Sequence, residues 1–137
     1  MSPAYAIETA PAYVIEEDVR NGVIKMTVQG FFDLETLRRH FDENDGIVRK
    51  WRSLGRPIRV LIDAVNLLPH TPEGQALVQS STKRIYVPGD RVALLVGSNL
   101  VKMQMRRALT QGEVINFFVS ANAAMTWLMA QKQSVNA

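Results

Sequence analysis

Apolar side chains occupy every second position from Ile24 to Val28, with polar side chains between them. This period of two is typical of a β-strand that buries one face and exposes the other. A second short segment with strand composition, Tyr13–Glu17, precedes it, and Asn21-Gly22 between the two is a strong turn signal. The sequence therefore predicts an antiparallel hairpin at the start of the ordered chain.

A helical period follows the hairpin. Asp33 is placed to cap the first turn, and Gly55 and Pro57 end the pattern. The sequence predicts one amphipathic helix of roughly five to six turns, in which Asp45-Gly46 is a point where the helix could bend, because an interior glycine costs about 1 kcal/mol relative to alanine. The apolar positions that share its inner face are Leu34, Leu37, Phe41, Val48 and Trp51.

Strands and helices alternate through the rest of the chain. The predicted strands are 58–63, 92–96 and 114–119, and the helices that follow them begin at Thr71-Pro72, at Gly97-Ser98-Asn99 (running to about Gln111) and at Ser120 (running to about Ala130). Met125, Leu128 and Met129 are expected on the inner face of the last helix. The predicted fold class is α/β: an N-terminal β-hairpin followed by three β–α units, with a mixed, mostly parallel five-stranded sheet.

The composition is that of one globular domain. The chain has 137 residues, of which 47% are hydrophobic and 21% charged, and we expect a single domain over 12–130 with loose tails at 1–11 and 131–137. The absence of cysteine excludes disulfides and thiolate metal sites. Neither a signal-peptide pattern nor an apolar run long enough to span a membrane is present, so a cytoplasmic protein is expected.

The net charge of +3 is unevenly distributed along the chain. Residues 1–48 carry a net charge of −5, whereas residues 49–90 and 91–137 carry +4 each. The basic cluster from Arg49 to Arg59 straddles a predicted helix end, where cations complement the helix dipole. The charge pattern therefore indicates a polarised molecule that does not bind nucleic acid.

Two strand motifs carry a resemblance to a known family. They are V-L-I-D-A at 60–64 and V-A-L-L-V-G-S-N at 92–99, in the element order described above. Over about residues 12–130 the chain resembles the SpoIIAA-like family, small bacterial relatives of the STAS domains of anti-sigma-factor antagonists, and more distantly the Sec14-type fold. The resemblance implies a singly wound β–α superhelix with helices mostly on one face. It also implies a non-catalytic regulatory or protein-interaction module; the alternative is a carrier of a small apolar or lipidic ligand.

The same resemblance identifies a position to inspect for phosphorylation. In anti-sigma-factor antagonists a strand ends in aspartate and the next helix opens with Asp-Ser-Ser-Gly, whose serine accepts phosphate. Residues 68–74 of this chain read L-P-H-T-P-E-G, so Thr71 is the hydroxyl at the equivalent place. Pro72 follows it directly, and the simpler interpretation of Thr71 is a helix N-cap.

Catalytic and metal-binding patterns are scarce. The chain has two histidines, of which His40 is expected to be solvated on the first helix and His70 lies in a predicted loop. Their spacing does not match a zinc motif. His70 with Asp63 and Thr71 could imitate a triad, but a separation of seven positions from Asp63 to His70 does not dictate that they converge. The sequence therefore predicts no enzymatic activity, no cofactor and no metal.

One strand-to-helix turn could bind an anion. Ser98 and Asn99 open the helix that carries Lys102 and Arg106, and free N–H groups at a helix N-terminus attract negative charge. The glycines of a dinucleotide motif and the lysine of a P-loop are missing here. The alternative interpretation is that Ser98 serves only as a helix cap.

An interface is expected on the sheet face that the helices leave uncovered. Strand alternation places Leu61, Leu95 and Phe118 together on that face, and rimmed apolar patches commonly mark interfaces. The simplest use of one such patch is a homodimer; the competing explanation is that a helix or the N-terminal segment covers it. An apolar pocket of roughly 300 Å³ or more would instead favour the ligand carrier.

Overall fold

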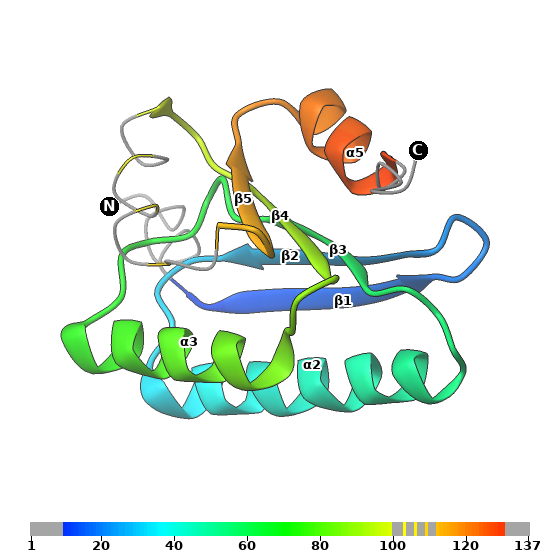
Figure 1. The fold of residues 1–137 in the computed structure, drawn as a ribbon. Coiled ribbons are helices and arrows are strands. Elements are labelled where there is room, and N and C mark those ends of the chain that lie inside the picture. The colour runs from blue at the N-terminus through cyan, green and yellow to red at the C-terminus, as the bar shows by residue number, and fades with distance from the viewer. Residues whose placement is uncertain (1–9, 100–102, 104–105, 107–108, 110–111, 131–137) are drawn as a thin grey trace.

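One mixed sheet of five strands carries three helices in the part of the chain that the computed structural model describes, residues 10–99, 103, 106, 109 and 112–130 (Figure 1). The elements are β1 (Ala12–Asp18), β2 (Val23–Gln29), α2 (Leu34–Ser53), β3 (Arg59–Asp63), α3 (Pro72–Ile85), β4 (Arg91–Leu95), β5 (Ile115–Phe118) and α5 (Ala121–Met129). The strands lie in chain order, β1 antiparallel to β2 and all other pairs parallel. The predicted α/β fold with its hairpin and mixed sheet is confirmed.

The hairpin forms where the sequence predicts it. Tyr13 pairs with Val28 in the register. The turn closes through the Asp18 carboxylate, which accepts a hydrogen bond from the backbone N–H of Asn21 at 3.1 Å. Gly22 adopts a φ of 71°, which a residue without a side chain reaches at little cost. Asn21 and Gly22, which predicted the turn, both take part in it, and Asp18 adds a contact that the Asn-Gly signal did not include.

α2 is one continuous helix with the predicted ends. Asp33 caps it by accepting a hydrogen bond from the Thr36 N–H at 2.8 Å, and Gly55 leaves it with a φ of 72°. Asp45-Gly46, where the sequence allowed a bend or a break, lies inside this continuous helix. Asn44 and Val48 are buried on either side of Gly46 and hold the backbone against the core, so tertiary packing overrides the low helix propensity of glycine.

The two faces of the sheet are covered unequally. α2 and α3 pack side by side on one face, and α5 crosses the other (Figure 1). Side chains of β3 alternate accordingly: Val60 is fully buried in the larger core under α2 and α3, and Leu61 packs with α5. Within α5, Leu128 is fully buried and Met125 partly so, but Met129 is exposed, which corrects its predicted inward position.

Two predicted segments fall largely outside the described residues. Of the helix expected from Gly97 to about Gln111, the structure describes only 97–99, 103, 106 and 109. Of the expected tails, residues 1–9 and 131–137 lie outside the described residues.

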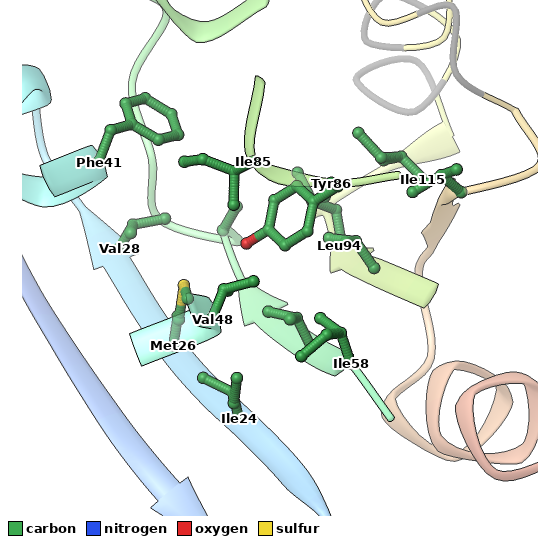
Figure 2. Close-up of a cluster of buried hydrophobic side chains, with 14 of the residues drawn as sticks. Ile24, Met26, Val28, Phe41, Val48, Ile58, Ile85, Tyr86, Leu94 and Ile115 are labelled. Atoms are coloured by element: carbon green, nitrogen blue, oxygen red, sulfur yellow. The ribbon is translucent and has the colours of Figure 1, made fainter. Parts of the chain in front are cut away.

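The larger core contains one buried polar pair. Tyr86 lies at the centre of the cluster in Figure 2, and its hydroxyl donates a hydrogen bond to the Asn44 side-chain oxygen at 3.0 Å. Burial raises the pKa of the Tyr86 hydroxyl, so it stays protonated and remains a donor at neutral pH. The pair joins α2 to the end of α3 inside the core.

Tyr86→Phe is expected to lower the free energy of unfolding by about 1–3 kcal/mol, because it leaves a buried acceptor on Asn44 without a partner. The matched control is Tyr13→Phe, whose hydroxyl bonds Glu43 at the surface at 3.0 Å, and it should cost less than about 0.5 kcal/mol. Urea denaturation of the three proteins measures both values. Equal losses would contradict the buried pair.

Candidate functional site

The carboxyl ends of the parallel strands meet along one edge, which we call the carboxyl edge. Backbone hydrogen bonds connect the segments there: Leu68 donates to the Gly30 carbonyl at 3.0 Å, and Ala64 donates to Leu95 at 3.0 Å. Val96 donates to Phe118 at 2.9 Å and joins the last strand to the row. Loops from β2, β3, β4 and β5 are thus held side by side, and ligands and partners of open α/β sheets commonly bind at such an edge.

Four exposed apolar side chains gather on this edge. Phe31, Val65, Leu68 and Val119 are 37%, 47%, 37% and 51% exposed. Phe31 directly follows Gly30, which is bridged to Leu67 beside Leu68, and a side chain on Gly97 would approach Val65 within 3.5 Å. Single exposed apolar residues are ordinary, but a row of them on adjoining loops indicates an interaction surface. We call this row the apolar edge.

Thr71 begins α3 on the same edge and acts as its N-cap. Its hydroxyl oxygen accepts a hydrogen bond from the Gly74 N–H at 3.1 Å, and Pro72 occupies the first helical turn. Gly74 allows a close approach here, because an added Cβ would lie 3.1 Å from the Cβ of His70 and 3.3 Å from Leu37 on α2, which is a tight contact. This geometry agrees with the N-cap interpretation that the sequence favours for Thr71.

The residues proposed to bind an anion are only partly described. Ser98 and Asn99 lie directly after β4 at the carboxyl edge and are exposed, as is Arg106. Lys102 lies outside the described residues. The anion site therefore stays a prediction.

The residues predicted to form a dimer interface do not form an open patch. Leu95 is buried, and Leu61 and Phe118 are partly buried in a cluster with Ala124 and Leu128 of α5. The competing explanation from the sequence was that a helix covers this face. α5 is that helix, so this explanation is confirmed. The sheet is covered on this face because Phe118 and its neighbours offered the apolar surface that the inner side of α5 requires.

His40 is buried, which corrects the prediction that it is solvated. It is 5% exposed on α2 and packs edge-on against Tyr13, with the ring centroids 4.8 Å apart. Burial lowers its pKa from 6.5 to about 4, so the ring is neutral at physiological pH. The sequence did contain the signal: His40 continues the helical stripe of Leu37 and Phe41, but its polarity hid it.

A cavity of about 70 Å³ lies between α2, α3 and the sheet, with His40 and His70 in its wall. This volume is well below the roughly 300 Å³ of ordinary ligand pockets, and a lipid chain does not fit in it. The size agrees with a packed interaction module better than with a lipid carrier.

Within the described part of the chain, no three His, Asp or Glu side chains come together in a way that could hold a metal ion. None of the helices described here is both long and apolar enough to cross a membrane.

Comparison with known proteins identifies the fold class. No protein-family model matches the sequence, and no curated protein matches it either. An uncharacterised DUF3478-family protein from Shewanella loihica with a SpoIIAA-like fold matches with a TM-score of 0.64 and 18% identity, over 87% of this chain and 94% of that one. An anti-sigma factor antagonist from Mycobacterium paratuberculosis matches with a TM-score of 0.61 and 11% identity, over 89% and 97%. The chain therefore has a SpoIIAA-like fold.

Proposed function

We propose that this protein is a non-catalytic regulatory module that binds a protein partner through its apolar edge. The observation that carries the proposal is the row Phe31, Val65, Leu68 and Val119, exposed on three loops of the carboxyl edge. The similarity in fold to an anti-sigma factor antagonist supports a regulatory role. Burial of such a row against a partner removes apolar area from water, which is the main driving force of association.

The arrangement of the two histidines supports a role without catalysis. A nucleophile needs a base within hydrogen-bonding reach. The buried Nδ1 atoms of His40 and His70 have no hydrogen-bond partner, and the Thr71 hydroxyl accepts from a backbone amide as a cap. A nucleophile paired with a base is therefore not seen at these positions.

A second copy of the chain is the simplest alternative partner. The face with Leu61, Leu95 and Phe118 is covered by α5, so a homodimer built there would need α5 to move. A dimer through the apolar edge needs no such movement. The test of the apolar edge therefore also measures the oligomeric state of the purified protein.

The test compares charge substitutions at two ends of the sheet. Leu68→Asp with Val119→Asp places two carboxylates in the apolar edge. The matched control is Val19→Asp, because Val19 is 47% exposed, close to the 51% of Val119, and lies in the hairpin turn at the other end of β2. Quantitative affinity capture from the native host and light scattering are applied to all three proteins.

We expect the wild type and Val19→Asp to bind the same partner. The double variant should bind that partner at least about tenfold more weakly, since a buried unpaired charge is costly at an interface. Light scattering decides whether that partner is a second copy. Identical partners and identical oligomeric states for all three proteins would contradict an interaction through the apolar edge.

A further inference from the structure

One cation of the basic cluster from Arg49 to Arg59 has no partner among the residues that the structure describes. It is Arg59, the first residue of β3, whose guanidinium group forms neither a hydrogen bond nor an ion pair with them. Its Nη1 atom lies beside the hairpin turn, 3.9 Å from the position that a Cβ on Gly22 would take. The other four cations are paired: Arg49 with Asp45, Lys50 with Glu17, Arg52 with Asp90, and Arg56 with the ring of Trp51. Arg59 is therefore available to a ligand.

Arg91 lies beside Arg59 on the neighbouring strand. The two residues are register partners of β4 and β3. Both side chains project from the face of the sheet that α5 crosses, because the residues two positions further along each strand, Leu61 and Ala93, pack with α5. Like charges at facing positions of a sheet repel each other and lower stability. An anion that contacts both guanidinium groups would offset this repulsion.

The end of α5 holds Arg91 in place and uses only part of it. Its Nη1 group donates to the carbonyl oxygens of Trp127, at 2.7 Å, and of Ala130. Its Nε and Nη2 groups bind nothing in the described part of the chain. Arginine presents its N–H donors in a rigid fork that matches the oxygens of carboxylate and phosphate groups. The remaining donors of Arg91 are therefore positioned in advance for such a group.

A cleft of about 270 Å³ opens where these two arginines emerge. It lies at the amino ends of β3 and β4, beneath the end of α5 (Figure 1). Its wall consists of Pro57, Ile58, Arg59, Gly89, Arg91 and Ala130. The volume is close to the roughly 300 Å³ at which ordinary ligand pockets begin, so the cleft can hold a small organic molecule.

The carboxylates near the cleft do not neutralise its arginines. Asp90 directly precedes β4, but its side chain is buried and both of its oxygens bind Arg52. Asp18 of the hairpin forms an ion pair with Lys25 at 3.3 Å. Glu113, just before β5, is exposed and does not belong to the wall of the cleft. The cleft therefore carries a net positive charge.

We propose that this cleft binds a small organic phosphate, with the phosphate group on Arg59 and Arg91. A phosphate monoester carries a charge of about −1.5 to −2 at pH 7 and three acceptor oxygens, so it can answer both guanidinium groups, whereas a carboxylate carries a single charge. Pro57 and Ile58 provide an apolar wall for the organic part. Arg59 reaches the phosphate by turning away from Gly22, which breaks no hydrogen bond or ion pair within the described residues.

This site does not depend on the proposed partner interaction. The cleft lies at the amino ends of the strands, whereas the apolar edge lies at their carboxyl ends. The test of the cleft uses no protein partner, so either proposal can fail without the other.

The test measures binding of phenyl phosphate to the full-length protein by titration calorimetry in about 0.1 M salt, where charges further apart than about 10 Å are largely screened. Benzoate is the matched probe with the same ring and one negative charge. Arg59→Gln and Arg91→Gln each remove one fork, and Arg59→Lys keeps the charge without the fork. The control is Arg38→Gln, because Arg38 is exposed on α2, on the other face of the sheet from α5. Circular dichroism checks that each variant is folded.

We expect saturable binding of phenyl phosphate, with benzoate weaker by at least about tenfold. Arg59→Gln should weaken phenyl phosphate by at least about tenfold, the effect of one hydrogen bond to a charged group, and Arg59→Lys should lie in between. Arg38→Gln should change it by less than about twofold. If Arg91→Gln releases α5 and fails to fold, Arg59→Gln still decides, because Arg59 holds no described side chain.

Three results would overturn the proposal. The first is the absence of saturable binding of phenyl phosphate to the wild type. The second is equal binding of benzoate, which would show that the cleft does not select phosphate. The third is an equal loss of affinity in Arg59→Gln and Arg38→Gln, which would show that the anion responds only to the net charge of the protein.

Discussion

Trp51→Ala is expected to lower the free energy of unfolding by about 3–5 kcal/mol, the usual cost of truncating a large buried aromatic residue. The Trp51 side chain is 1% exposed and packs α2 against the sheet. Its indole N–H also donates to the Glu17 carboxylate of β1 at 2.8 Å, so the substitution removes a contact between the helix and the edge strand as well. Chemical denaturation followed by circular dichroism measures the loss.

Leu54→Ala is the matched control for this substitution. Leu54 lies three residues further along the chain, ends the same helix and is 64% exposed, so its truncation should change stability by less than about 0.5 kcal/mol. A domain of this size has about 5–15 kcal/mol of stability, so the first substitution removes a large share and the second does not. Similar denaturation midpoints for both variants would show that α2 does not bury Trp51.

Acidification from about pH 6.5 to about pH 4 is expected to remove about 3 kcal/mol of stability through His40 alone. The buried His40 has its pKa lowered from 6.5 to about 4 because burial disfavours its charged form, although the nearby Glu43 acts in the opposite direction. Between these two pH values the unfolded chain binds a proton that the folded protein does not. The free energy of unfolding therefore falls as the pH falls through this window. Above about pH 6.5 and below about pH 4, His40 causes no further change in stability.

His40→Phe keeps a ring in the aromatic cluster and removes the titration. In the variant the slope of stability against pH between about 4 and 6.5 should be smaller by up to about 1.4 kcal/mol per pH unit. A smaller slope should remain, since burial lowers the pKa of His70 in the same direction. The lowered pKa of Asp33, which comes first from its hydrogen bond to Thr36, acts at lower pH, because an aspartate ionises near pH 3.8 when unfolded. Parallel curves for the two proteins would contradict the burial of His40.

Local patterns in the sequence were sufficient for the elements and their order. The hairpin was predicted from its alternation and from Asn21-Gly22, and α2 from its apolar stripe between Asp33 and Gly55. These signals act over a few residues, through turn geometry and backbone hydrogen bonding, so the sequence displays them directly. Chain-order pairing of the parallel strands followed because short right-handed crossovers place consecutive strands side by side.

The prediction that His40 is solvated was wrong because it followed from the polarity of the side chain. His40 lies on the buried stripe, but a polar side chain was assigned to the surface on its own chemistry. Its burial depends on Tyr13 and Phe32, which come from other parts of the chain and surround the ring. Only the packed structure brings these rings together, and it also makes the ring neutral by removing it from water.

The position of α5 and the functional surfaces were decided by tertiary structure. β4 is almost entirely apolar, so its sequence could not say which face the last helix would cover. The apolar edge joins Phe31, Val65, Leu68 and Val119 from three loops, and the cavity joins His40 to His70 across thirty residues. Sequence alone determined the elements, the sheet and its order, because these follow from short-range patterns. The three-dimensional packing decided which side chains meet, because contacts between distant segments depend on how the faces of all elements fit together.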